Sequence, residues 1–162
     1  MNAGSGVLTE KGIGKHIIRL HHIGIVFPGE DGVKRSEKLA EVLGLQVDYE
    51  NHINAYDSDL IFTKHDGTFP TIEFILPFSG VLTEYNNGKG GIAHLCVEVD
   101  DIKACEDEIR AMGMEMLEKE AVQGTDFLKA NFIRPKYTAG VLIELVQIEG
   151  DIDYNYRINR SK

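Results

Sequence analysis

The chain has 162 residues, 43% hydrophobic and 27% charged, a balance typical of a globular protein with one proper core. Its 26 acidic side chains outnumber 17 basic ones, and the formal charge of −9 argues against a nucleic-acid partner. No apolar run approaches the ~20 residues of a membrane helix, and no secretory signal precedes the domain, so we expect no membrane partner and a cytoplasmic location. Cys96 and Cys105 are too few for a disulfide framework and are expected to be small buried side chains.

The first half of the chain reads as a strand, a helix and three strands. Residues 1–15 contain four glycines and little periodicity, which indicates a flexible arm. Residues 16–27 form an isoleucine-rich strand pattern, and residues 34–43 have the apolar spacing of a helix that ends at Gly44. Three further strands are expected at 45–49, 56–63 and 71–76, the first two separated by a polar turn at 50–52.

The second half repeats this order after a glycine-rich linker. A strand follows the linker, and a helix begins near Asp101, with Asp100 or Asp101 as its N-cap and Gly113 as its end. Strands are expected at 114–119, 131–133 and 141–148, with an irregular loop at 120–129. The predicted organisation is an arm (1–15), a single domain (16–148) with module one (16–78), a linker (79–91) and module two (92–148), and a tail (149–162).

Each module carries one histidine and one glutamate at equivalent places. His22 and His94 lie in apolar strands, and Glu73 and Glu144 are single acids in otherwise apolar strands. The histidine and the glutamate are 51 positions apart in the first module and 50 in the second. If the two βαβββ modules pair about a pseudo-twofold axis, all four side chains can meet at the centre. His21 competes with His22 for the first position, and the alignment of the repeats favours His22.

A buried carboxylate needs a partner that offsets its desolvation, and a cation is one such partner. Two imidazoles and two carboxylates form a mixed nitrogen and oxygen shell that suits one divalent ion, namely Zn²⁺, Co²⁺, Ni²⁺, Mn²⁺ or Fe²⁺. The recurrence of all four residues outweighs the alternative that each is a structural side chain. The sequence therefore predicts a metal site formed by His22, Glu73, His94 and Glu144.

Four segments carry a resemblance to a known family, and together they cover residues 18–147. On these segments the chain resembles the vicinal oxygen chelate (glyoxalase/bleomycin resistance/dioxygenase) superfamily, and within it the methylmalonyl-CoA epimerases. The resemblance implies an α+β, glyoxalase-like fold in which two paired βαβββ modules form a curved mixed sheet around a central metal site. The segments are His22-Ile23-Gly24-Ile25, residues 72–77, residues 90–101, and Arg134-Pro135-Lys136 followed by residues 140–145.

The resemblance also implies an activity and a partner. It indicates an epimerase that moves a proton at the carbon next to a thioester carbonyl, acting on a small acyl thioester as a homodimer. Glu144 matches the metal-bound glutamate that is one candidate base. The second base of the family is a carboxylate on a middle strand of the first module, and Asp59 is the candidate here, beside Asp57, because no glutamate falls in register.

Three departures from the family pattern flank the expected substrate pocket. Ala93 precedes His94 where relatives usually have a second histidine, Arg134 stands where they have histidine, and residues 123–129 lack their glycine-rich composition. These changes concern the identity of the substrate more than the metal.

Three alternative functions share this fold. A glyoxalase I-like lactoylglutathione lyase uses the same four ligands and the same proton transfer. An extradiol dioxygenase uses two histidines and one carboxylate, so a fourth protein ligand argues against it. A non-catalytic binding protein of this fold lacks the metal ligands, whereas all four are present here.

Overall fold

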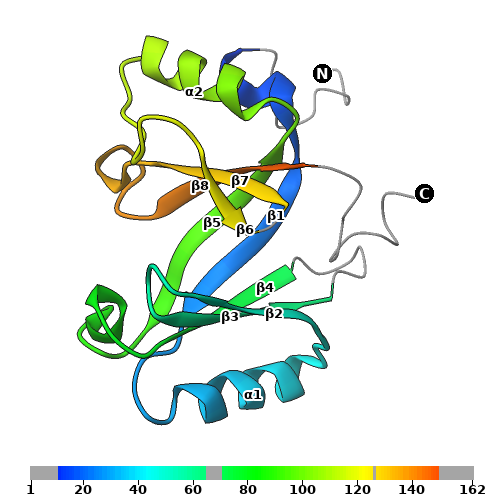
Figure 1. Cartoon of the computed structure of the whole chain (residues 1–162), viewed down its shortest axis with the longest axis vertical. Coiled ribbons are helices and arrows are strands. Elements are labelled where there is room, and N and C mark those ends of the chain that lie inside the picture. Colours follow the sequence, from blue (N-terminus) through cyan, green and yellow to red (C-terminus); the bar gives the residue numbers. More distant parts are fainter. Residues whose placement is uncertain (1–10, 65–70, 126, 150–162) are drawn as a thin grey trace, which may run out of the picture. The chain divides into compact units, whose positions relative to one another are not determined.

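The structure is a computed structural model that describes residues 11–64, 71–125 and 127–149. The chain is a mixed α+β protein, and its strands and helices follow the order expected from the sequence, β1-α1-β2-β3-β4 and then β5-α2-β6-β7-β8 (Figure 1). The expected arm and tail lie mostly outside the described residues. The elements are β1 (Ile17–Val26), α1 (Gly32–Leu43), β2 (Val47–Ile53), β3 (Ser58–Thr63), β4 (Thr71–Pro77), β5 (Gly91–Val99), α2 (Ile102–Ala111), β6 (Val122–Thr125), β7 (Leu128–Ile133) and β8 (Leu142–Ile148), with 3-10 helices at Gly12–His16, Val81–Glu84 and Pro135–Tyr137.

The described residues form two compact units, and the boundaries between them fall inside strands β1 and β5. The first unit holds residues 22–64 and 71–95, and its strand order is β2-β3-β4-β1-β5. The second unit holds residues 11–21, 96–125 and 127–149, and its strand order is β1-β5-β8-β7-β6. Each unit therefore contains part of both central strands.

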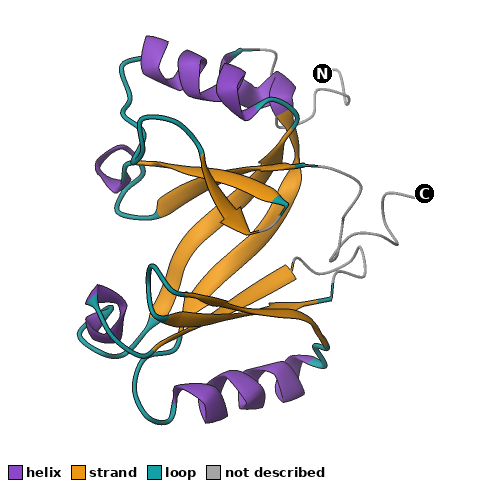
Figure 2. Cartoon of the chain, viewed as in Figure 1, coloured by secondary structure: helices purple, strands orange, loops and turns teal. Residues whose placement is uncertain are grey.

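In the first unit, β4 is the buried strand on which the others are arranged. All seven residues of β4 are buried, and it pairs with β1 in parallel and with β3 in antiparallel orientation. Helix α1 lies along one face of β2, β3 and β4 (Figure 2). Gly44 ends this helix with φ of 68°, a left-handed conformation that favours glycine, as the sequence predicted.

The sequence-based prediction of a turn at residues 50–52 is wrong. Those residues belong to β2 and pair in order with Ile61, Leu60 and Asp59 of β3. The turn occupies residues 54–57, with φ of 44° at Asp57. β2 is the edge strand of the order, and its side chains are exposed or half-buried. An edge strand tolerates polar residues that resemble a turn signal in the sequence.

In the second unit, the strand expected at 114–119 is replaced by a single bridge. Met116 pairs with Ile133, and the next strand is β6, which lies within the region expected to be an irregular loop. Met114 and Met116 turn inward onto the apolar core formed by Val99, Ile102, Cys105, Ile109, Met116, Ile133 and Leu145. The alternation of inward-facing residues at 114 and 116 resembles a strand pattern in the sequence, although the backbone forms only one bridge here.

Helix α2 begins and ends at the residues that the sequence indicated. The Asp101 carboxylate accepts a hydrogen bond from the Ala104 N–H at 2.9 Å, and Gly113, with φ of 83°, follows the last turn. Cys105 lies on the buried face of α2, and burial, together with the charges of Asp100 and Asp101, raises its pKa to about 12. Cys96 and Cys105 are buried, as expected, and neither forms a disulfide.

The helices of the described residues are short. The longest, α1, has 12 residues, and within the described ranges no helix has the length and apolar character needed to cross a bilayer.

Removing the Asp101 cap should destabilise the second unit. For Asp101→Ala we expect a loss of about 1 kcal/mol in the free energy of unfolding, measured by urea denaturation, because the Ala104 N–H loses its acceptor. Asp101→Asn keeps an acceptor oxygen and is the matched control, with a smaller loss expected. Equal losses in the two variants would contradict the capping role.

Candidate metal centre

Three of the four predicted ligands converge in the first unit. His22 comes from β1, Glu73 from β4 and His94 from β5, and all three are buried. Glu73 Oε2 lies 2.9 Å from His94 Nε2 and 3.4 Å from His22 Nε2, and the two Nε2 atoms are 2.9 Å apart. Three donor atoms from three adjacent strands therefore face one point.

The spacing of these atoms fits a shared metal ion. Donors about 2.1 Å from one ion lie about 3.0 Å apart at right angles and about 3.4 Å apart at the tetrahedral angle. Within the described residues, Glu73 Oε2 makes no hydrogen bond of normal geometry despite its short distance to His94. A buried carboxylate oxygen so placed between two imidazole nitrogens is a suitable ligand for a divalent cation.

The electrostatics of Glu73 favour its charged form. Burial alone would raise the pKa of Glu73, but the charge of His22 and polar contacts with His22 and His94 outweigh this effect and hold the pKa well below its ordinary value. Glu73 is therefore a carboxylate at neutral pH, the form that binds a metal.

Two neighbours orient the imidazole rings. The rings of Phe62, on β3, and His22 form a T-shaped pair with centroids 5.3 Å apart and an interplanar angle of 89°. Gly24, on β1, leaves space for the His94 ring, because a Cβ at this position would lie 2.2 Å from His94 Cε1. Gly24 is thus required because a side chain at this position would collide with the His94 ring.

The other predicted residues are placed as follows. Glu144 lies on β8 in the second unit, buried at 8% exposure and opposite Phe132 of β7. Asp59 lies on β3 opposite Leu76, whereas Glu73 is opposite Phe62. Because successive strand residues alternate between faces, Asp59 and Phe62 point to opposite faces, and the structure does not bring Asp59 to the three-ligand cluster.

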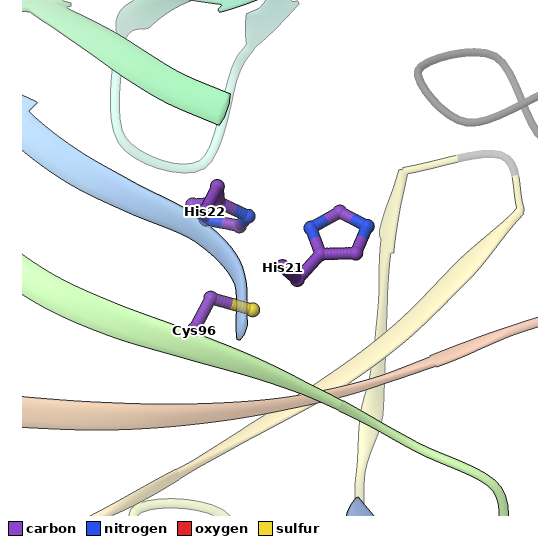
Figure 3. Close-up of side chains that lie close together, drawn as sticks. All are labelled: His21, His22 and Cys96. Carbon is purple, nitrogen blue, oxygen red and sulfur yellow. The ribbon is translucent and has the colours of Figure 1, made fainter. Parts of the chain in front are cut away.

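Two polar pairs in the second unit, each with at least one fully buried side chain, were not assigned a role from the sequence. His21 on β1 and Cys96 on β5 are fully buried, with a ring nitrogen and the sulfur within 4.8 Å of each other (Figure 3). Glu98 is 1% exposed and accepts a hydrogen bond from Arg19 Nε at 2.8 Å. His21 was visible in the sequence only as a competitor of His22, and it lies instead beside Cys96.

Known proteins resemble this chain in both sequence and fold. Residues 21–132 match the family described as the Glyoxalase/Bleomycin resistance protein/Dioxygenase superfamily. The chain belongs to this superfamily. Its curated relatives in the superfamily include the mitochondrial methylmalonyl-CoA epimerase of Mus musculus, 31% identical over 80% of this chain and 72% of the relative. The ethylmalonyl-CoA/methylmalonyl-CoA epimerase of Cereibacter sphaeroides is also 31% identical, over 80% of this chain and 98% of the relative.

Solved structures of superfamily members have the same fold. Methylmalonyl-CoA epimerase from Mycobacterium tuberculosis superposes with a TM-score of 0.76 at 24% identity, covering 89% of this chain and 95% of that chain. A variant of the Streptomyces coelicolor methylmalonyl-CoA epimerase, in complex with 2-nitronate-propionyl-CoA, superposes with a TM-score of 0.71 at 25% identity, covering 83% and 99%. The expected glyoxalase-like fold is confirmed.

A methyl group at Gly24 should weaken metal binding. In Gly24→Ala the new Cβ displaces the His94 ring, so we expect Co²⁺ affinity, measured by titration of chelator-stripped protein, to fall at least about tenfold. Gly124→Ala is the matched control, since the nearest atom to its new Cβ is 3.6 Å away. Unchanged affinity in a folded Gly24→Ala protein would refute the role of this close approach.

Proposed function

We propose that this chain is a metal-dependent epimerase that moves the proton next to the carbonyl of a methylmalonyl-type acyl thioester. The observation that carries the proposal is the convergence of His22, Glu73 and His94 on one point. The names of the relatives support the reaction and the substrate class, because the curated relatives from mouse and Cereibacter sphaeroides are methylmalonyl-CoA epimerases. Their identity to this chain is about 30%, so the acyl group is part of the proposal.

The residues of the cluster would hold one divalent cation. When bound, such an ion supplies positive charge for the substrate oxygens and makes the α-proton easier to remove. The imidazole nitrogens of His22 and His94 and the carboxylate of Glu73 have the donor chemistry that suits Co²⁺, Zn²⁺, Ni²⁺, Mn²⁺ or Fe²⁺. The charge of His22 and the polar contacts with His22 and His94 keep Glu73 ionised despite its burial.

Glu144 is the proposed fourth ligand and the first proton-transfer group. Its place in the second βαβββ repeat is equivalent to that of Glu73, and both side chains are buried on strands that are otherwise apolar. Its carboxylate would take the proton from one face of the α-carbon and return it to the substrate or to solvent. A homodimer and a cytoplasmic location stay predictions.

A glyoxalase I-like lyase is the second candidate function. The same three ligands and the same proton transfer suit glutathione hemithioacetals, so the ligand cluster alone supports both reactions. The assay that separates them offers the Co²⁺-loaded protein a methylmalonyl thioester and a hemithioacetal in parallel. A binding protein without activity would convert neither substrate.

Replacing Glu144 should abolish proton transfer. In Glu144→Gln, with saturating Co²⁺, we expect exchange of the substrate α-proton into D₂O to fall at least about 100-fold, because the amide is not a base. Exchange is followed by NMR, and the fold by circular dichroism. Glu149→Gln is the matched control, since Glu149 is half-exposed and pairs with Lys129 at 2.6 Å on the surface. Unchanged exchange in Glu144→Gln would remove Glu144 from the mechanism.

A further inference from the structure

Inversion at a carbon needs a proton donor on the face opposite to the base, and the three-ligand cluster contains no spare group for this role. Asp59 and Glu50 lie on the face of the sheet away from Glu73, since Asp59 pairs with Leu76 and Glu50 pairs with Ile61. The second proton-transfer group has to come from the face of the sheet that carries Glu73. This inference rests on the proposed epimerase function.

Tyr49 of β2 lies on that face. It is opposite Phe62 in the β2–β3 pair, and Phe62 is opposite Glu73 in the β3–β4 pair, so the three side chains share one face. The rings of Tyr49 and Phe62 are 6.2 Å apart, and Phe62 in turn contacts the His22 ring at 5.3 Å. Ring contacts therefore lead directly from Tyr49 to His22, a candidate metal ligand.

An irregularity in β2 places Tyr49 on this face. The register shifts between Val47 and Tyr49, so that Asp48 is an extra residue and Tyr49 takes the position opposite Phe62. A bulge of this kind re-aims the side chains that follow it, and bulges are enriched beside active sites. Asp48 itself is exposed, whereas Tyr49 is half-buried against Phe62.

The neighbours of Tyr49 on the strand do not offer the same chemistry. After the bulge, alternation assigns Tyr49, Asn51 and Ile53 to the face of Glu73 and assigns Glu50 and His52 to the other face. Among residues 49–53 of β2, Tyr49 is the titratable group on the side of the ligands.

We propose that Tyr49 is the second acid–base residue, whose phenol gives its proton to the face of the α-carbon opposite to the carboxylate base. In one direction the carboxylate breaks the C–H bond and becomes a carboxylic acid, while the phenol O–H protonates the other face and leaves a phenolate. The carboxylic acid then returns a proton to the phenolate through solvent, which restores the resting enzyme. A phenol, with a usual pKa of about 10, is neutral at pH 7 and is ready to donate, whereas the carboxylate is ready to accept.

The test uses the full chain loaded with Co²⁺ and the two methylmalonyl thioester epimers, each supplied separately in D₂O. Tyr49→Phe removes only the hydroxyl and keeps the ring on Phe62. We expect epimerisation to fall at least about 100-fold, while α-proton exchange survives for one epimer, with retention of configuration, and is lost for the other. A purely structural role would not separate the two epimers.

Tyr56→Phe is the matched control, because Tyr56 lies in the 54–57 turn and is 61% exposed. Its epimerisation should stay within about twofold of the parent, as for other surface changes, and metal content should be equal in all three proteins. The inference is overturned if Tyr49→Phe epimerises within about threefold of the parent, or if it loses exchange from both epimers alike. A parent protein that exchanges no α-proton would overturn the proposed function itself, and the inference with it.

Discussion

A carboxylate buried between two imidazoles is the constraint on which this protein depends. Glu73 is 4% exposed, yet the contacts of His22 and His94 keep it ionised. Burying such a charge without a compensating partner is costly, so the fold is arranged to bring compensation from two other strands. A divalent cation at the same point would satisfy all three side chains together.

The strand arrangement explains how His22 and His94 come to lie beside Glu73. β4 lies between β3 and β1, and β1 is followed by β5, so the order of the strands brings together one candidate ligand each from β1, β4 and β5. Phe62 supports the ring of His22, and Gly24 makes room for the ring of His94. The arrangement of the candidate ligands therefore depends on Phe62 and Gly24 as well as on the ligands themselves. This close packing holds the donor atoms at separations of about 3 Å.

The internal repeat is the reason that the candidate ligands and the order of the elements could be predicted from the sequence. Two histidines and two glutamates at matching intervals predicted four metal ligands, of which the first unit brings His22, Glu73 and His94 together. The order of strands and helices followed from hydrophobic periodicity and from the glycines that end the helices. The turn after β2, the single bridge at Met116 and the bulge at Asp48 were not predictable, because each depends on which strand the segment pairs with. A one-residue register shift leaves no mark in composition, so the sequence did not show that Tyr49 shares the face of Glu73 or that Asp59 lies on the other face.

X-ray absorption at the cobalt edge of the Co²⁺-loaded protein tests the central claim most directly. The account predicts about one ion per chain, with imidazole nitrogen and oxygen neighbours at about 2.1 Å and no sulfur. A sulfur neighbour at about 2.3 Å would place the ion at the His21 and Cys96 pair instead and would contradict the site built on Glu73. Failure to bind a stoichiometric ion would contradict the metal-dependent function as a whole.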